Sequence, residues 1–127
     1  MEGQPVITVM IVTNQPIMRE GLRLRVEQEP DMQVVCEATD LAQTLNGYRR
    51  WCPDVAVIDL QSPQGAVQRV MKGIRGLSAS TPLVVLAEYP EEIDAQPRTA
   101  QGSTLVVSKA YASTEVIPAI RKMAEPR

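Results

Sequence analysis

The chain has 127 residues, and its 13 lysines and arginines against 15 aspartates and glutamates give a formal net charge of −2. This length fits one domain, and 44% hydrophobic with 22% charged residues excludes wholesale disorder. There is no histidine, which removes the usual general base and the commonest metal ligand. A mildly acidic chain also gives a nucleic-acid backbone little attraction. We expect a globular domain that is not an enzyme and does not contact DNA itself.

Aliphatic runs and segments of helical spacing alternate in the first half of the chain. The run Val6–Val12 predicts a strand, and Pro16, with Asn14 as a candidate N-cap, predicts the start of a helix after it. A second strand is predicted over Val34–Cys36, and a second helix over residues 41–51. The longest apolar run is too short to cross a bilayer and lacks a signal-peptide pattern, so we expect a cytoplasmic protein with no membrane partner.

The same alternation continues in the second half. A strand is predicted over Val55–Leu60, then a helix bracketed by Gly65 and Gly76, and a fourth strand over Leu83–Ala87. Residues 90–101 begin like a helix, but a proline falls inside the segment. An interior proline costs a helix about 3 kcal/mol, so we expect this fourth helix to be short or irregular.

A fifth strand, predicted over Thr104–Val107, precedes a last helix with Ser113 as its candidate N-cap. Pro118 should distort the start of that helix. Strands that alternate with helices predict an α/β domain, with a parallel sheet covered by helices on both faces. No linker or repeat divides the chain, so we expect one domain over residues 1–127 with a core from about 6 to 124.

Polar side chains fall at the ends of the predicted strands, where ligands bind in an open parallel sheet. Thr13 and Asn14 follow the first strand, Asp59 ends the third, Ala87 ends the fourth, and Lys109 follows the fifth. The carboxyl ends of parallel strands meet at one edge, which brings the aspartate and the lysine together. Either they form a neutral ion pair that holds the strand ends, or they form a reaction centre.

Three segments of the chain stand in a recognisable order. Residues 11–22 read I-V-T-N-Q-P-I-M-R-E-G-L, residues 53–60 read P-D-V-A-V-I-D-L, and residues 107–110 read V-S-K-A. They resemble I-V-D-D-H-P-x-x-R-E-G-L, P-D-V-x-x-x-D-L and L-L-K-D of the receiver domains of bacterial two-component response regulators, LuxR-type (NarL/FixJ-like) subgroup. The resemblance covers about residues 7–123. It implies a flavodoxin-like (CheY-like), doubly wound, five-stranded parallel sheet in the order 2-1-3-4-5.

In that family, an aspartate at the end of the third strand accepts a phosphoryl group from a histidine kinase, with Mg²⁺ neutralising the phosphoryl oxygens. The resemblance makes Asp59 the candidate phosphoacceptor. It makes Lys109 the phosphate-contacting residue, or the ion-pair partner of the aspartate.

The other family positions of the pocket do not match. The acidic pair that holds the metal is replaced by Thr13 and Asn14, the hydroxyl residue of the fourth strand by Ala87, and the aromatic residue that rotates on activation by Val106. The family's three carboxylates and one lysine leave a negative charge that calls for a divalent cation, whereas Asp59 and Lys109 cancel. We therefore expect weak or absent Mg²⁺ binding, no metal site and no cofactor. Glu88 is the nearest spare acid, but adjacent strand residues point to opposite faces.

These departures predict an atypical receiver domain, the N-terminal regulatory module of a transcriptional regulator. We expect it to act by phosphorylation-independent dimerisation or docking, as a homodimer. The alternative is a phosphorylation-dependent switch at Asp59 with a histidine kinase as partner, and a third possibility is a small ligand in the neutral pocket. DNA would be contacted only by a separate C-terminal domain outside these residues, because residues 124–127 look like the start of a linker.

Overall fold

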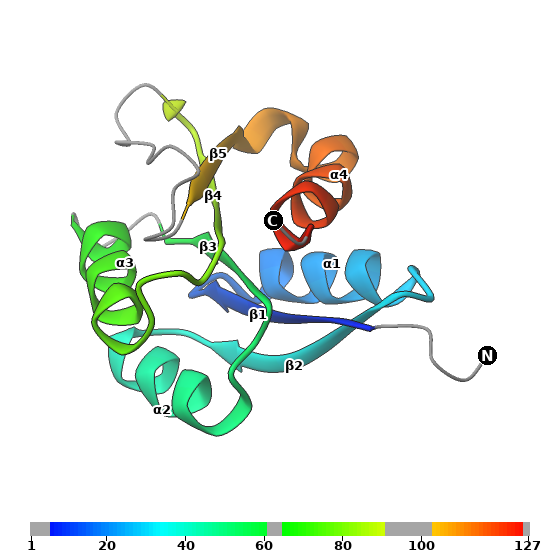
Figure 1. Ribbon diagram of the computed structural model, residues 1–127. Coiled ribbons are helices and arrows are strands. Elements are labelled where there is room, and N and C mark those ends of the chain that lie inside the picture. Colours follow the sequence, from blue (N-terminus) through cyan, green and yellow to red (C-terminus); the bar gives the residue numbers. More distant parts are fainter. Residues whose placement is uncertain (1–5, 61–64, 91–102, 126–127) are drawn as a thin grey trace.

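The computed structural model describes residues 6–60, 65–90 and 103–125, and it arranges five strands in one parallel sheet (Figure 1). The strands are β1 (Ile7–Thr13), β2 (Met32–Ala38), β3 (Val55–Asp59), β4 (Leu83–Ala87) and β5 (Thr104–Ser108). The helices are α1 (Pro16–Glu27), α2 (Leu41–Trp51), α3 (Ala66–Leu77), the short 3₁₀ helix η2 (Lys109–Tyr111) and α4 (Ala112–Ala124). The strand order is β2-β1-β3-β4-β5, which confirms the predicted topology.

All five predicted strands are present, and the largest difference is at β2. This strand runs over Met32–Ala38, whereas the sequence predicted only three residues. The prediction was too short because the polar residues Gln33 and Glu37 interrupt the apolar pattern. Both residues are exposed, and β2 lies at the edge of the sheet with β1 as its neighbour. An edge strand tolerates polar residues on its open side, which is why an apolar run underestimates its length.

The strands alternate their side chains between two apolar layers. Val9 and Ile11 of β1 belong to a buried cluster with α1 and α4, whereas Met10 and Val12 belong to a second cluster with α2 and α3. Figure 1 shows α1 and α4 together on one side of the sheet and α2 and α3 on the other. The predicted helices on both faces are therefore confirmed for the described residues. None of the described helices is long and apolar enough to cross a bilayer.

Two predicted N-caps are wrong by one or two residues. Gln15, not Asn14, precedes α1, and Pro16 is the first residue of the helix. At the last helix, Tyr111 rather than Ser113 occupies the N-cap position. Neither residue caps its helix with a side-chain hydrogen bond.

Pro118 does not divide the last helix, because α4 runs from Ala112 to Ala124. Pro118 is exposed, while Val116, Ile117, Ala119 and Ile120 on either side of it are buried. Proline removes one backbone hydrogen bond, but the apolar residues around it hold the helix against the sheet. The short helix expected over residues 90–101 lies almost wholly outside the described residues.

Close packing of α2 against β2 gives the first prediction. A Cβ atom at Gly47 would lie 2.2 Å from Cys36 Sγ and 3.0 Å from Met10 Cε. We expect Gly47→Ala to lower the free energy of unfolding by about 1–3 kcal/mol, and Cys36→Ala to relieve most of that loss in the double variant. Urea unfolding measures both. Gly76→Ala is the matched control, since nothing lies within 4 Å of its Cβ position, and it should raise stability by up to about 1 kcal/mol. Equal effects at the two glycines would contradict this packing.

Candidate functional site

The carboxyl ends of β3 and β5 are joined by a largely buried ion pair. Asp59, the last residue of β3, has a side chain only 1% exposed, and Lys109, just after β5, has a side chain 15% exposed. Lys109 Nζ lies 3.1 Å from Asp59 Oδ1. The two residues predicted to meet at this edge therefore do so.

Gln15 joins the same site from the loop after β1. Lys109 Nζ donates a hydrogen bond to Gln15 Oε1 at 3.4 Å, and the Gln15 backbone N–H donates to Thr13 Oγ1 at 3.2 Å. Thr13 pairs with Asp59 in the register of β1 and β3, so the loop, the two strands and the lysine form one cluster. Sequence reasoning missed Gln15, although its place two residues beyond a buried strand was a usable signal.

Burial raises the pKa of Asp59 above its ordinary value. The Lys109 ammonium opposes this rise, and the Thr13 hydroxyl does so more weakly, while the negative charge of nearby Glu88 adds to it. The carboxylate loses more by leaving water than it regains from the lysine, which is common for buried ion pairs. Glu88 therefore acts on the site through its charge.

The second oxygen of the aspartate is less well satisfied. Asp59 Oδ2 is buried and has no hydrogen-bond partner among the described residues. Residues 61–64, just after β3, lie outside the described part of the chain.

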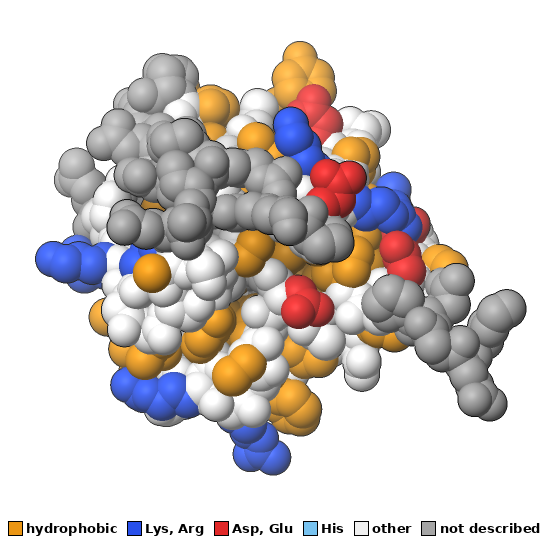
Figure 2. All heavy atoms as spheres, in the orientation of Figure 1, with side chains coloured by type: hydrophobic (Ala, Val, Ile, Leu, Met, Phe, Trp, Pro, Cys, Tyr) orange, Lys and Arg blue, Asp and Glu red, His pale blue; other side chains and the backbone are white. Residues whose placement is uncertain are grey.

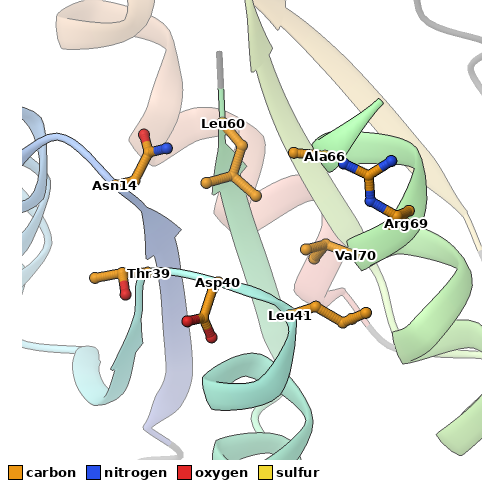
Figure 3. Close-up of a pocket in the computed structure, with 8 residues that line it drawn as sticks. All are labelled: Asn14, Thr39, Asp40, Leu41, Leu60, Ala66, Arg69 and Val70. Atoms are coloured by element: carbon orange, nitrogen blue, oxygen red, sulfur yellow. The ribbon is translucent and has the colours of Figure 1, made fainter. Parts of the chain in front are cut away.

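Asn14 follows Thr13 at the end of β1. It is exposed and lines a cavity of about 210 Å³ between the end of β1, the start of α2 and α3 (Figure 3). The Asp40 side chain in that wall accepts a hydrogen bond from the Gln43 backbone N–H, which caps α2. Leu60, the residue after Asp59, lines the same cavity.

Ala87 and Val106 occupy the positions that the sequence assigned to them. Ala87 ends β4, is half-buried and pairs with Ser108, so its methyl group offers no donor at this edge. Val106 is half-buried in β5 opposite Val85. An aliphatic side chain held in a strand has no polar tip with which to report a change at Asp59.

The residues that the structure describes at this edge are a poor match for a magnesium ion, which prefers several oxygen ligands. Within residues 6–60, 65–90 and 103–125, no group of three or more acidic, histidine or cysteine side chains could hold a metal. Lys109 already contacts one oxygen of Asp59, and a positive charge there disfavours a second cation.

The raised pKa of Asp59 predicts a pH dependence. Because the folded pKa lies above the unfolded value of about 3.9, ionisation of Asp59 costs folding free energy, and this contribution to stability falls as pH rises through the folded pKa. Asp59→Asn cannot ionise, so its stability relative to the parent chain should increase between pH 4 and pH 7. Urea unfolding at several pH values measures this. A relative loss over the same range would mean that the lysine outweighs burial.

Loss of the lysine should be more severe than loss of the acid. Lys109→Met leaves the Asp59 carboxylate buried without its partner, which we expect to cost about 3 kcal/mol at pH 7. The cost should shrink at acidic pH, where Asp59 binds a proton, and in the double variant Asp59→Asn/Lys109→Met. Lys122→Met, an exposed lysine on α4, is the control. A loss that is equal at both pH values would show that packing alone is responsible.

Comparisons with known proteins give the family. The family model for the response regulator receiver domain matches residues 9–121. The chain is 29% identical over 118 residues to the transcriptional regulatory protein YxjL of Bacillus subtilis, covering 93% of this chain and 54% of that protein. It is 25% identical over 121 residues to the transcriptional regulatory protein NarL of Mycobacterium tuberculosis, covering 95% and 56%. The chain thus spans about half the length of the curated relatives it matches.

Solved structures agree. A LuxR-family two-component response regulator from Aurantimonas sp. SI85-9A1 has a TM-score of 0.75 and 26% identity, with 94% of this chain and 85% of that chain covered. The signal receiver domain of NarL from Mycobacterium tuberculosis has a TM-score of 0.75 and 24% identity, with coverages of 97% and 99%. On the family match and these relatives, the chain belongs to the response regulator receiver domain family, in its LuxR-type subgroup.

Proposed function

We propose that this chain is an atypical receiver domain, the regulatory module of a LuxR-type transcriptional regulator, and that it acts without phosphorylation. Its regulatory role is to bind a second copy or to dock on a partner. DNA is contacted by a separate C-terminal domain of the longer protein. The observation that carries the proposal is the 3.1 Å contact between Lys109 and Asp59, at an edge where Thr13 and Asn14 replace the expected acidic pair.

The charge balance of the site supports this proposal. The family's three carboxylates need a divalent cation, and that cation is required for phosphoryl transfer to the aspartate. Here one carboxylate and one ammonium neutralise each other, and Gln15 supplies a further acceptor for the ammonium at 3.4 Å. The Asp59–Lys109 pair is neutral and only the charge of Glu88 is added nearby, so the site has less electrostatic need of Mg²⁺ than three carboxylates and one lysine have.

The route from the site to the surface is also altered. Ala87 cannot donate a hydrogen bond to a phosphoryl oxygen, and Val106 stands where the family's aromatic side chain rotates. A phosphoryl group on Asp59 would therefore lack both the donor that draws in the loop after β4 and the side chain that carries the change outward. This favours a surface whose binding is constitutive.

One observation favours the alternative, a phosphorylation-dependent switch supplied by a histidine kinase. Asp59 Oδ2 has no hydrogen-bond partner among the described residues, so one oxygen of the nucleophile is uncommitted. In the switch, the Asp59 carboxylate accepts a phosphoryl group, whereas under the proposed function it does not. Measuring the adduct on Asp59 distinguishes the two.

We expect no phosphoryl adduct on Asp59 when the chain is incubated with Mg²⁺ and acetyl phosphate, and no change in oligomeric state with beryllofluoride. Intact mass and light scattering measure the two outcomes. The association state should be the same in Asp59→Ala. A stoichiometric adduct that changes assembly would overturn the proposal in favour of the switch.

A variant that restores the acidic pair tests the same proposal through a gain of Mg²⁺ binding. Thr13→Asp/Asn14→Asp restores the acidic pair beside Asp59, and the chain should then be stabilised by millimolar Mg²⁺ in thermal unfolding, whereas the parent chain is not. Thr13→Asn/Asn14→Gln, which adds polar bulk without charge, is the matched control. Equal stabilisation of all three proteins would show that the acidic pair is not what the site lacks.

A further inference from the structure

Positive charge gathers on the two helices that cover the opposite side of the sheet from α1 and α4. α2 and α3 carry five of the chain's 13 lysines and arginines and none of its 15 aspartates and glutamates. Figure 2 shows basic side chains without acidic ones along the side of the molecule where α3 and α2 lie, whereas both kinds are interspersed on the α4 side. The chain is mildly acidic overall, so this positive charge is segregated on one face.

The two sides of the sheet also differ in how their charges are paired. On the α4 side, Arg121 Nη2 lies 2.7 Å from Asp31 Oδ1, and the arginines of α1 have carboxylate partners too. On the other side, three exposed cations have no carboxylate within 4 Å among the residues that the structure describes, namely Arg49, Arg50 and Lys72. The chain itself therefore does not neutralise this face.

Helix dipoles account for part of the pattern only. Arg49 and Arg50 lie in the last turn of α2 and Arg75 in the last turn of α3, where a cation complements the negative end of the helix. Arg69 is the fourth residue of α3, at the positive end, where a cation is disfavoured, and Lys72 lies in the middle of the helix. Arg69 and Lys72 are three residues apart and so lie on the same side of α3. Their charge serves neither helix end.

An exposed tryptophan adjoins these cations. Trp51 is the last residue of α2 and the only tryptophan of the chain, and it is 48% exposed. The Arg50 guanidinium carbon lies 5.3 Å from the centroid of its ring. Tryptophan and arginine are enriched among the residues that contribute most to binding at protein–protein interfaces. The surface thus combines positive charge with a flat apolar anchor.

The two helices present this surface as one packed layer. A Cβ atom on Gly73 would lie 2.9 Å from Leu41 Cδ1 and 3.1 Å from Leu45 Cδ2, so α3 packs closely against α2. At the end of α3, Arg75 Nη2 donates to the Ser103 backbone carbonyl oxygen at 2.9 Å, and a neutral carbonyl does not cancel the charge of the arginine. A preformed surface loses little conformational entropy when a partner binds.

We propose that the basic face, formed by Arg49, Arg50, Arg69 and Lys72 with Trp51 beside them, docks an acidic amphipathic helix of a partner protein. This rests on the proposed function, because it gives the docking role a surface and gives the partner a chemistry. Carboxylates of the partner pair with the cations of the face, and its apolar side chains cover the tryptophan ring. Charge complementarity of this kind speeds association and selects the partner.

A nucleic acid suits this face less well. The part of the chain outside α2 and α3 is net acidic, so it repels a long polyanion that the basic face attracts. A phosphate backbone also offers no apolar group to cover Trp51. A short acidic helix with apolar side chains meets both requirements.

Trp51 makes the contact directly measurable, because no other tryptophan contributes to the emission. The probe is a synthetic helical peptide of about five turns, with glutamate along one side and leucine along the other. We expect it to shift the Trp51 emission to shorter wavelength, since the ring leaves water, and a fluorescein-labelled copy to bind in anisotropy. The same peptide with glutamine for glutamate is the control and should do neither.

Charge reversal locates the binding site. Lys72→Glu should weaken binding of the acidic peptide about fivefold. Lys122→Glu makes the same change in net charge at an exposed lysine of α4 and should have little effect. Both positions are exposed, so circular dichroism should report unchanged folding.

Four outcomes would overturn this docking site: no binding of the acidic peptide, equal binding of the glutamine peptide, equal weakening by the two substitutions, or tighter binding of a short duplex DNA. Each of them would leave the proposed function standing, because the adduct measurement tests that separately. Conversely, a phosphoryl adduct on Asp59 that changes assembly would overturn the proposed function even if the peptide bound at Lys72.

Discussion

The contact between Asp59 and Lys109 is the constraint on which the carboxyl edge of the sheet depends. Parallel strands bring their ends together, and the end of β3 is an acid that is 1% exposed. A buried carboxylate needs a partner, and Lys109 supplies it from the end of β5 while Gln15 holds the lysine from the loop after β1. Three segments far apart in sequence are thereby tied by the protein's own side chains.

Burial of the carboxylate costs free energy, because it raises the pKa of Asp59 despite the nearby Lys109 ammonium. A fully buried pair that only stabilised the fold could be replaced by apolar residues at no loss. The pair is therefore weak evidence for stability. Its stronger effect is on charge, since it neutralises the place where the family's receivers gather negative charge around a metal. This neutrality is what separates the proposed module from a phosphorylated switch.

The sequence predicts the sheet well because its strands are buried aliphatic runs, and Leu83–Ala87 is correct to the residue. It does less well at helix ends, where Gln15 and Tyr111 precede the helices in place of the better capping residues Asn14 and Ser113. A cap is decided by where the packed helix begins, which depends on tertiary contacts. Pro118 lies inside α4, where its buried neighbours hold the helix against the sheet despite the low helix propensity of proline. Gln15 was missed although its place just beyond β1 was a usable signal, because its contact with Lys109 depends on tertiary structure.

A neutral, self-contained site also changes what can regulate this domain. Covalent modification alters a surface by changing charge inside the fold, and here neither Ala87 nor Val106 can carry such a change outward. The surfaces that remain are those exposed at all times. Association through a constitutive surface follows mass action. Under this proposal, the controlling variable is the concentration of the protein, set by its synthesis and degradation, rather than the state of Asp59.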